Sequence, residues 1–197
     1  MPPTPDHGGQ FFYVLQDALK ILFVDDDPIL REFAQVHLTT ETAQVHTAAD
    51  GLDGLEALEA GYAADAILLD LEMPGMDGFE MLERLRAEPR WADLPVIVVT
   101  GREDVGAVDR AFQLGATSFV VKPLNWRLLS YQLRYVHRST LAEAARRRSE
   151  AAMQERLLKV CAESSRFLAT ALAAQPDLRP AATAYADALE MAAGRAA

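Results

Sequence analysis

Short apolar runs alternate with longer amphipathic stretches along residues 20 to 138 of the chain. The runs consist mainly of Ile, Leu and Val, as in strands that are buried on both faces of a parallel sheet. In the stretches between them, apolar residues recur every three or four positions, as in helices that cover such a sheet. The pattern predicts five strands, at residues 21–24, 45–48, 66–69, 96–99 and 118–121.

The amphipathic stretches predict helices near residues 28–38, 52–60, 78–87 and 105–114, with a fifth helix that begins at Asn125. A strand followed by a helix, repeated five times, indicates an α/β fold with a five-stranded, doubly wound parallel sheet and helices on both faces. Ligands of such folds bind at the carboxyl ends of the strands. Functional side chains are therefore expected where the strands end.

The two ends of the chain do not follow this alternation. Residues 1–10 contain three prolines and two glycines, so residues 1–18 are expected to form a leader. After residue 10, the spacing of Phe12, Leu15 and Leu19 is typical of a helix and suggests a docking segment. Neither Pro nor Gly occurs from Asn125 to Ala174, which predicts a long helix that is continuous or broken once.

The distal part of this long helix carries a stripe of apolar and small residues whose spacing alternates between four and three. This spacing favours a coiled coil, and the stripe consists of Met153, Leu157, Val160, Ser164, Phe167 and Ala171. A turn at residues 174–180 and an alanine-rich helix at residues 181–193 would complete a helical hairpin. Two helices alone bury little apolar surface, so a homodimer that forms a four-helix bundle is expected.

Composition and charge narrow the class of protein. The net charge of −10 opposes general binding to a phosphate backbone, and the sequence has no helix-turn-helix pattern, so direct DNA binding is not expected. The basic run Arg146 to Arg148 is interpreted as a solvated helix face. Cys161 is the only cysteine, which indicates a reducing compartment and a cytoplasmic protein. No apolar run approaches the roughly 18 residues that a membrane span needs, so membrane insertion is not expected.

Acidic residues follow the ends of the first and third predicted strands. Asp27 precedes Pro28 and is interpreted as a helix N-cap. Asp25, Asp26 and Asp70 need another explanation, because neighbouring carboxylates repel one another unless a cation neutralises them. Carboxylate oxygens are ligands that Mg²⁺ takes, and Mg²⁺ is therefore the expected cofactor.

The fourth and fifth predicted strands end in a hydroxyl and an amine. A carboxylate beside a metal ion can attack phosphorus and form an aspartyl-phosphate, and Asp70 is the candidate nucleophile. Lys122, one of three lysines in the chain, can neutralise phosphoryl oxygens from a second side. Thr100 can donate its hydroxyl to a phosphoryl oxygen, and the small Gly101 beside it leaves room for phosphate.

These segments together resemble the receiver domain of two-component response regulators, as in the chemotaxis regulator. The resemblance covers about residues 19–137 and is carried by "ILFVDDDP", "ILLDLEMPGMDG", "VIVVTG" and "GATSFVVKPL". It implies a flavodoxin-like fold for a receiver domain at residues 19–138. Residues 139–197 are then a helical extension that forms a coiled-coil or dimerisation segment.

The resemblance also implies roles for individual residues. Asp70 would be the phosphoacceptor, with Asp25 and Asp26 as the acidic pair around Mg²⁺ and Glu72 giving its backbone carbonyl to the metal. Thr100 would be the switch hydroxyl, Lys122 the phosphate partner with Pro123 holding the turn, and Phe119 the aromatic switch residue; without the resemblance, Phe119 is interpreted as a core residue. A sensor histidine kinase or phosphotransfer protein would supply the phosphoryl group, and an unknown downstream protein would bind the face of helix four, strand five and helix five.

Three other interpretations stay open at this point. Haloacid-dehalogenase-like phosphatases also use an aspartate nucleophile with Mg²⁺, but Glu72 stands where they place a second Asp. A scaffold with an inactive site would not need Asp25, Asp26, Asp70, Thr100 and Lys122. The stretch "WRLLSYQLRYVHRS" is similar to receivers that precede cyclic-dinucleotide cyclase or phosphodiesterase domains, so the sequence could be the regulatory part of a larger protein. The sequence shows no separate catalytic domain, and a switch is expected rather than a metabolic enzyme.

Overall fold

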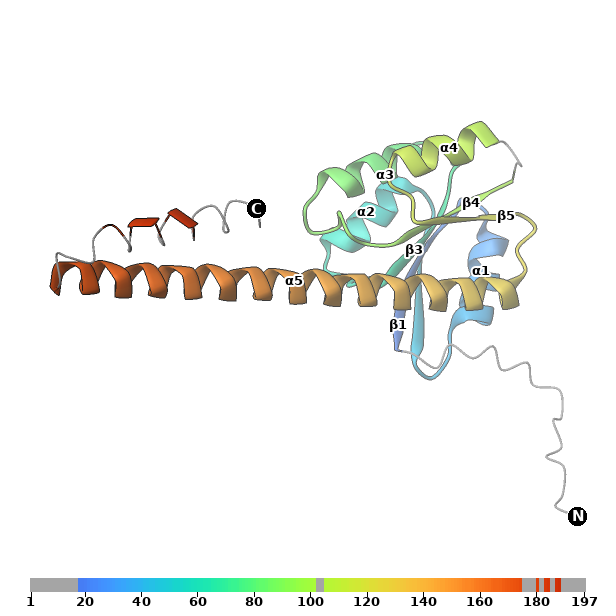
Figure 1. Ribbon diagram of the computed structural model, residues 1–197. Helices are drawn as coiled ribbons and strands as arrows, with labels where there is room; N and C mark the ends of the chain where they lie inside the picture. Colours follow the sequence, from blue (N-terminus) through green and yellow to red (C-terminus); the bar gives the residue numbers. More distant parts are fainter. Residues whose placement is uncertain (1–17, 102–104, 175–179, 181–182, 185–186, 189–197) are drawn as a thin grey trace, which may run out of the picture. The chain divides into compact units, whose positions relative to one another are not determined.

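A computed structural model describes residues 18–101, 105–174, 180, 183–184 and 187–188 (Figure 1). The elements follow one another in the order β1 (Leu19–Val24), α1 (Pro28–Leu38), β2 (Ala43–Ala48), α2 (Gly51–Glu59), β3 (Ala66–Asp70), α3 (Gly78–Ala87), β4 (Val96–Thr100), α4 (Val105–Gln113), β5 (Ser118–Val121) and α5 (Trp126–Ala174). The predicted alternation of strands and helices is confirmed. The chain divides into two compact units, Met1–Thr140 and Leu141–Ala197.

The five strands form one parallel sheet in the order β2-β1-β3-β4-β5. β1 lies between β2 and β3, with Val24 opposite Ala48 on one side and Leu69 on the other. β3 pairs in turn with β4, and β4 with β5. Because the strand order reverses at β1, the doubly wound parallel sheet that the sequence predicts is confirmed.

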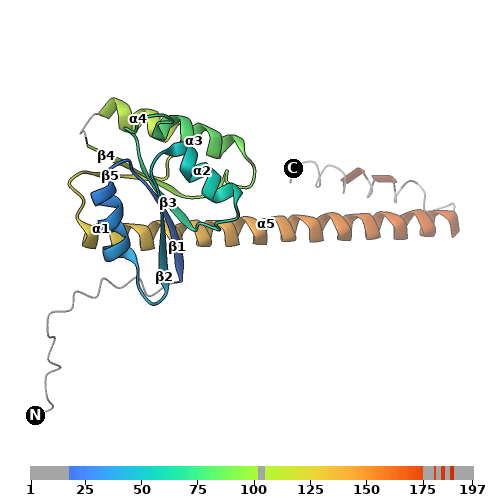
Figure 2. The ribbon, with the colours of Figure 1, turned by 180° about the vertical axis from the view of Figure 1, so that it is seen from behind.

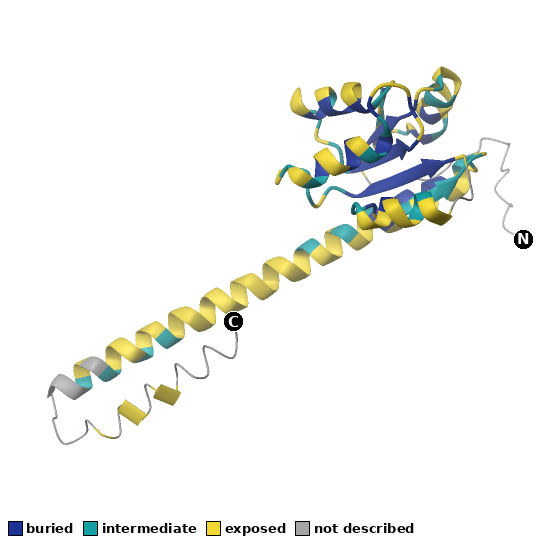
Figure 3. Cartoon of the chain, turned by 90° about the horizontal axis from the view of Figure 1, so that it is seen from above, coloured by how far each residue is buried: buried dark blue, intermediate teal, exposed yellow. Residues whose placement is uncertain are grey.

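Alternate side chains of the strands pack against helices on opposite faces of the sheet. On one face, residues of β1, β3 and β4 pack with α2, α3 and α4, including Leu55, Met81 and Ala111. On the other face, the intervening strand residues pack with α1 and the first turns of α5, including Leu38 and Leu133. The two views in Figures 1 and 2 show these two layers of helices, and Figure 3 shows that the sheet between them is buried.

Acidic and amide side chains fix where four of the helices begin. Asp27 caps α1 by accepting a hydrogen bond from the backbone N–H of Ile29, with Pro28 at the first helical position. Asp50, Asp77 and Asn125 accept equivalent bonds at the starts of α2, α3 and α5. The interpretation of Asp27 as an N-cap is confirmed, which leaves Asp25 and Asp26 for other interactions.

Gly78 brings the start of α3 against the end of β3. A Cβ atom at this position would lie 2.1 Å from the carbonyl oxygen of Asp70 and 2.8 Å from the Cα atom of Leu71. The backbone N–H of Gly78 donates to the carbonyl oxygen of Leu71 at 3.2 Å. Only glycine permits this approach, so the loop from residue 71 to 77 is held close to the strand end.

The ends of the chain bear out part of the expectations. Leu19 is the first residue of β1 and is buried, so its assignment to a helical face is wrong, whereas Phe12 and Leu15 lie outside the described residues. α5 is continuous over its 49 residues, as one of the predicted alternatives had it. Of the predicted turn at 174–180, residues 175–179 lie outside the described residues, and its two end residues, 174 and 180, have helical backbone. Beyond it, residues 183–184 and 187–188 are helical as well. None of the described helices is long and apolar enough to cross a bilayer.

Candidate functional site

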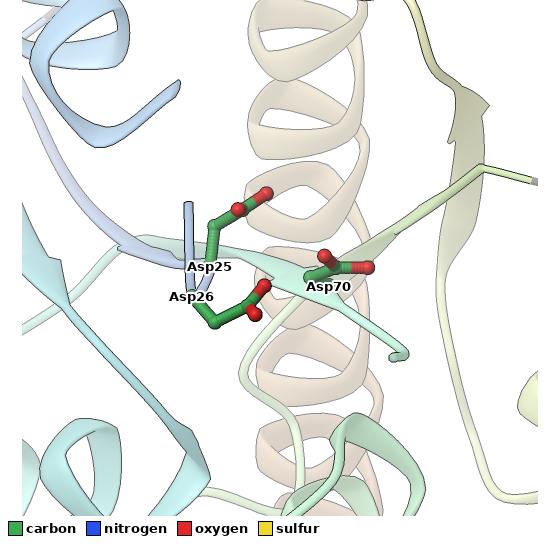
Figure 4. A group of neighbouring side chains, drawn as sticks. All are labelled: Asp25, Asp26 and Asp70. Carbon is green, nitrogen blue, oxygen red and sulfur yellow. The ribbon is translucent and has the colours of Figure 1, made fainter. Parts of the chain in front are cut away.

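Three carboxylates meet at the carboxyl end of the sheet. Asp70 is the last residue of β3, and Asp25 and Asp26 directly follow the adjacent strand β1. The register of β1 and β3, with Val24 opposite Leu69, places Asp25 beside Asp70. Carboxylate oxygens of the three residues lie within 4.8 Å of one another (Figure 4). The sequence therefore placed these three residues at the same edge correctly.

Asp25 is fully buried and held from several sides. Its Oδ1 atom accepts a hydrogen bond from the backbone N–H of Asp27 at 2.9 Å, and its carbonyl oxygen accepts one from Arg31 Nη1 at 2.6 Å. Asp26, the next residue, is exposed. The pair thus consists of one fixed carboxylate inside the protein and one carboxylate that faces solvent.

Lys122 brings an ammonium group to the buried carboxylates. Its Nζ atom lies 2.6 Å from Asp70 Oδ2 and 2.8 Å from Asp25 Oδ2. The lysine follows β5, and its backbone N–H donates to the carbonyl oxygen of Thr100 at 2.8 Å, which extends the β4–β5 pairing by one residue. The next peptide bond, Lys122–Pro123, is cis. The amine and the two acids come from three different strand ends, so the fold alone brings them together.

Burial and charge shift the pKa values at this site. Burial raises the pKa of Asp70 above its ordinary value; the hydrogen bond and charge of Lys122 oppose this shift, and the charge of Asp25 adds to it. Burial lowers the pKa of Lys122, but its bonds to Asp25 and Asp70 outweigh burial, so that pKa is raised. The site therefore holds a firmly protonated amine beside an aspartate whose charged form is costly.

The acidic cluster has the features expected of a cation site. Asp25 Oδ2 is buried and has no hydrogen-bond partner among the described residues, although the Lys122 ammonium lies within ion-pair distance. Two carboxylates beside one ammonium leave net negative charge in a poorly solvated place, which a second cation would neutralise. The donors are all hard oxygen atoms and include the solvent-facing Asp26. The chemistry of this set suits Mg²⁺.

Thr100 and Glu72 also lie at this edge. Thr100 is the last residue of β4 and is 2% exposed, and β4 pairs with β3 so that Asp70 is opposite Val99. The backbone N–H of Glu72 donates to Asp70 Oδ1 at 3.3 Å. The structure thus places Asp70 between an amide donor on one side and Lys122 on the other.

Phe119 lies on the edge strand β5, where its side chain is 41% exposed. Its ring meets that of Phe112 on α4 edge to face, with the ring centroids 6.2 Å apart. The interpretation of Phe119 as a core residue is therefore wrong, because an edge strand covered by α4 only in part leaves its outer side chains in solvent. The ring forms part of an α4–β5 surface instead.

Arg31 is a residue of this site that sequence reasoning missed. It lies one turn into α1, and its guanidinium donates to the Asp25 carbonyl. Its position four residues after the capping Asp27 was the available signal, because a long side chain in the first turn of a helix can reach back to the preceding strand end. Arg31 adds a positive group beside the acidic pair and fixes the backbone that carries it.

Comparison with known proteins agrees with this geometry. Residues 21–134 match the family model of the response regulator receiver domain. The chain belongs to this family. Membership replaces the phosphatase interpretation with that of a two-component signalling domain, and the flavodoxin-like receiver fold is confirmed.

Several curated response regulators are similar to this receiver chain. It is 39% identical over 119 residues to the transcriptional regulatory protein AfsQ1 of Streptomyces coelicolor, which covers 60% of this chain and 51% of AfsQ1. It is 33% identical over 121 residues to the DNA-binding dual master transcriptional regulator RpaA of Synechocystis, which covers 61% of this chain and 50% of RpaA. It is 35% identical over 134 residues to the response regulator PleD of Caulobacter vibrioides, covering 68% and 29%. The chain thus spans about half or less of these relatives.

Solved receiver structures are similar to the chain as well. A CheY-like receiver domain protein from Methanospirillum hungatei superimposes with a TM-score of 0.59 and is 27% identical, covering 64% of this chain and 99% of that one. The chemotaxis protein CheY4 of Vibrio cholerae gives a TM-score of 0.55 at 32% identity, covering 60% and 98%. These structures are covered almost completely, so the likeness lies in a whole receiver domain.

Proposed function

We propose that this protein is a phosphorylation-dependent switch that accepts a phosphoryl group on Asp70. The donor is the phosphohistidine of a sensor histidine kinase or of a phosphotransfer protein. One observation carries the proposal: the Asp70 carboxylate lies 2.6 Å from an ammonium group and within 4.8 Å of two further carboxylates, at the end of a buried strand. A structural ion pair needs one acid for one amine, whereas this arrangement suits phosphoryl transfer in the presence of a cation.

The transfer forms one bond and breaks one. An Asp70 carboxylate oxygen attacks phosphorus, an aspartyl P–O bond forms, and the P–N bond of the phosphohistidine breaks to leave the donor imidazole. Lys122 stays protonated and neutralises phosphoryl oxygens, and the backbone N–H of Glu72 orients the carboxylate. Asp25, Asp26, Asp70 and the carbonyl of Glu72 are proposed to hold Mg²⁺, which supplies charge neutralisation to the phosphoryl group when bound.

The conformational output of the switch is proposed to run through Thr100 and Phe119. New phosphoryl oxygens at Asp70 attract the Thr100 hydroxyl, and Phe119 moves into the space that this hydroxyl leaves. The exposed position of Phe119 supports this step, because the ring meets Phe112 edge to face and is otherwise partly in solvent. The α4–β5–α5 face is then read by a downstream protein rather than by DNA.

The domain organisation is part of the proposal. Residues 1–18 form a leader, residues 19–138 the receiver domain and residues 139–197 a helical extension that joins two copies into a homodimer. Four large apolar side chains of the extension support self-association, since each is about half exposed or more: Met153, Leu157, Val160 and Phe167. The protein is proposed to act in the cytoplasm as a switch.

The decisive experiment is modification by a small phosphodonor. Purified chain is incubated with acetyl phosphate and Mg²⁺, and intact mass and peptide mass spectra are recorded. We expect the mass of one phosphoryl group, located at Asp70, absent in Asp70→Asn and when Mg²⁺ is chelated. Asp109→Asn, at an exposed aspartate of α4, is the matched control and should be modified like the wild type.

Two results would contradict the proposal. Equal modification of the Asp70→Asn variant would place the acceptor elsewhere. Repeated turnover of an aryl phosphate, with release of phosphate in large excess over protein, would indicate a phosphatase rather than a switch.

A further inference from the structure

The distal half of α5 carries an apolar face that the described part of its own unit leaves uncovered. This tail stripe consists of Met153, Leu157, Val160, Ser164, Phe167 and Ala171, which share one side of the helix because they are spaced by three and four residues. Its four large side chains are 59%, 49%, 53% and 74% exposed, in the order Met153, Leu157, Val160 and Phe167. Exposed stripes of this kind mark interaction surfaces rather than solvated helix faces.

We propose that the tail stripe pairs with the same stripe of a second copy of this chain, and that the two helices run antiparallel with Ala162 at the centre. The inference rests on the homodimer of the proposed function and adds the orientation of its helices. It is independent of the phosphoryl chemistry, which belongs to the other unit of the chain.

The charges of the preceding segment determine where the pairing begins. Continuing the same spacing toward the N-terminus leads to Glu150, Arg146 and Glu143 instead of apolar residues. These residues form ion pairs within their own helix: Arg146 with Glu150 at 3.1 Å, and Arg147 with Glu143 at 2.9 Å. The self-complementary apolar segment is therefore short and runs from Met153 to Ala171.

The sizes of the stripe residues favour the antiparallel orientation. When two copies are reversed about Ala162, large Met153 faces small Ala171 and Val160 faces small Ser164, while Leu157 faces Phe167 of the partner subunit. In a parallel pair in register, each residue faces itself, so that Phe167 meets Phe167 of the partner subunit and the Ser164 and Ala171 layers are left underfilled. Close packing favours layers that differ little in volume, and the reversed pair narrows the spread, because it removes both the Phe–Phe layer and the two small layers.

A hollow on the helix and the pattern of its charges also favour the antiparallel orientation. Glu163, Ser164, Phe167 and Leu168 line an open hollow on this part of the chain, and in the reversed pair Val160 of the partner subunit faces Ser164 at this place. A parallel pair would also set the basic run Arg146 to Arg148 beside the same run of its partner. Reversal about Ala162 separates the two runs by roughly 45 Å, at about 1.5 Å per residue.

Mixed cysteine cross-linking of the full chain tests the orientation. Cys161, the only native cysteine, is replaced by serine, and Met153→Cys and Ala171→Cys are introduced into separate samples. Under mild oxidation we expect the mixture of the two variants to give a disulfide-linked dimer as its main product, while each variant alone gives little. Lys159→Cys, exposed and on the other side of the helix, is the matched control and should not cross-link in any mixture.

Sedimentation of the unoxidised variants separates the ways in which the inference can fail. A dimer in which each variant cross-links with itself would show parallel helices, which overturns this inference and leaves the homodimer standing. A monomer over the accessible concentration range would overturn both the inference and the homodimer, while the proposal for Asp70 would be unaffected. Cross-linking in the mixture alone, on a sedimenting dimer, supports the antiparallel pair.

Discussion

The two units of this chain use charged side chains in opposite ways. At the carboxyl end of the sheet, Asp25, Asp70 and Lys122 have side chains only 0%, 5% and 23% exposed. Along the distal helix, Arg146 and Glu150 are 67% and 63% exposed and pair within one helix at i and i+4. In the buried arrangement, each charge is stabilised mainly by the neighbouring charges. On the distal helix, water solvates each charge directly. The difference shows that burial makes an ion pair reactive: it shifts the pKa values of the paired groups and leaves charge that a cation or a phosphoryl group can neutralise.

The largest expected effect comes from removing the ammonium group of the buried site. Lys122→Met leaves Asp25 and Asp70 without their cation, and loss of one partner of a buried pair costs about 3 kcal/mol of the free energy of unfolding. Urea denaturation at pH 7 without divalent cations, followed by circular dichroism and by Trp fluorescence, measures this loss.

The sign of the pH dependence of this contribution follows from the raised pKa of Lys122. Burial lowers that pKa and the two aspartates more than offset it, so the stabilisation is present below the ordinary value of 10.5 and is lost as the pH rises through the folded-state pKa. Lys159→Met makes the same change at an exposed lysine of the distal helix and should alter stability by less than about 0.5 kcal/mol. Equal losses of unfolding free energy in Lys122→Met and Lys159→Met would show that burial does not make the Lys122 charge more important than the exposed charge of Lys159.

A second change tests the backbone of the site rather than its charge. Gly78→Ala introduces a Cβ atom at 2.1 Å from the Asp70 carbonyl oxygen, and the forced backbone shift should cost about 2 kcal/mol. Gly101→Ala is the matched control, since a Cβ atom there would meet no atom of the described residues within 4 Å, its chain neighbours apart. Thermal unfolding should show a clear fall in Tm for the first variant and little for the second. An unchanged Tm for Gly78→Ala would show that the loop after β3 is not tightly held.

A third change, Asp70→Asn, removes a buried carboxylate whose charged form is unfavourable. Burial raises the pKa of Asp70, and Lys122 only partly opposes it, so the contribution of Asp70 to stability is present below its ordinary pKa of 3.8 and is lost as the pH rises through the folded-state value. At pH 7 without divalent cations, Asp70→Asn should therefore be more stable than the wild type, by about 1 kcal/mol.

Added Mg²⁺ should reverse or reduce this difference, because a ligand that binds only the folded protein stabilises the wild type more than a variant with one carboxylate fewer. A thermal-shift titration with MgCl₂ at fixed pH measures both the difference in Tm without Mg²⁺ and its change as Mg²⁺ is added. Lower stability of Asp70→Asn in the metal-free protein would contradict the account of a costly buried charge.

The smallest effect is expected at an exposed pair of the distal helix. Arg146→Ala removes the bond to Glu150, which is worth about 0.3–0.5 kcal/mol, and introduces the residue with the highest helix propensity. The two terms nearly cancel, so the helix signal in circular dichroism and its thermal midpoint should hardly change. A large loss would show that the pair is part of a buried contact.

The sequence allowed the fold and the meeting of the site residues to be predicted for a simple reason. Parallel strands are buried on both faces and give apolar runs, and the sheet brings their carboxyl ends to one edge. The sequence alone therefore predicts that Asp25, Asp70, Thr100 and Lys122 lie together. Arg31 was missed because its bond is to the backbone carbonyl of Asp25, which no side-chain pattern announces. Phe119 was interpreted as core because an apolar run does not reveal that its strand lies at the edge of the sheet. Leu19 was assigned to a helical face because it is spaced from Phe12 and Leu15 as in a helix, whereas it is the first residue of strand β1.

Phosphoryl transfer from acetyl phosphate in the presence of Mg²⁺, followed by mass spectrometry of the modified peptide, shows directly whether Asp70 is the phosphoacceptor. We expect one phosphoryl group on Asp70, held as an acyl phosphate that acid, base and hydroxylamine all cleave. It should be lost in Asp70→Asn and strongly reduced in Lys122→Met, with Asp109→Asn unchanged. An unmodified Asp70 under conditions in which the folded protein binds Mg²⁺ would contradict it.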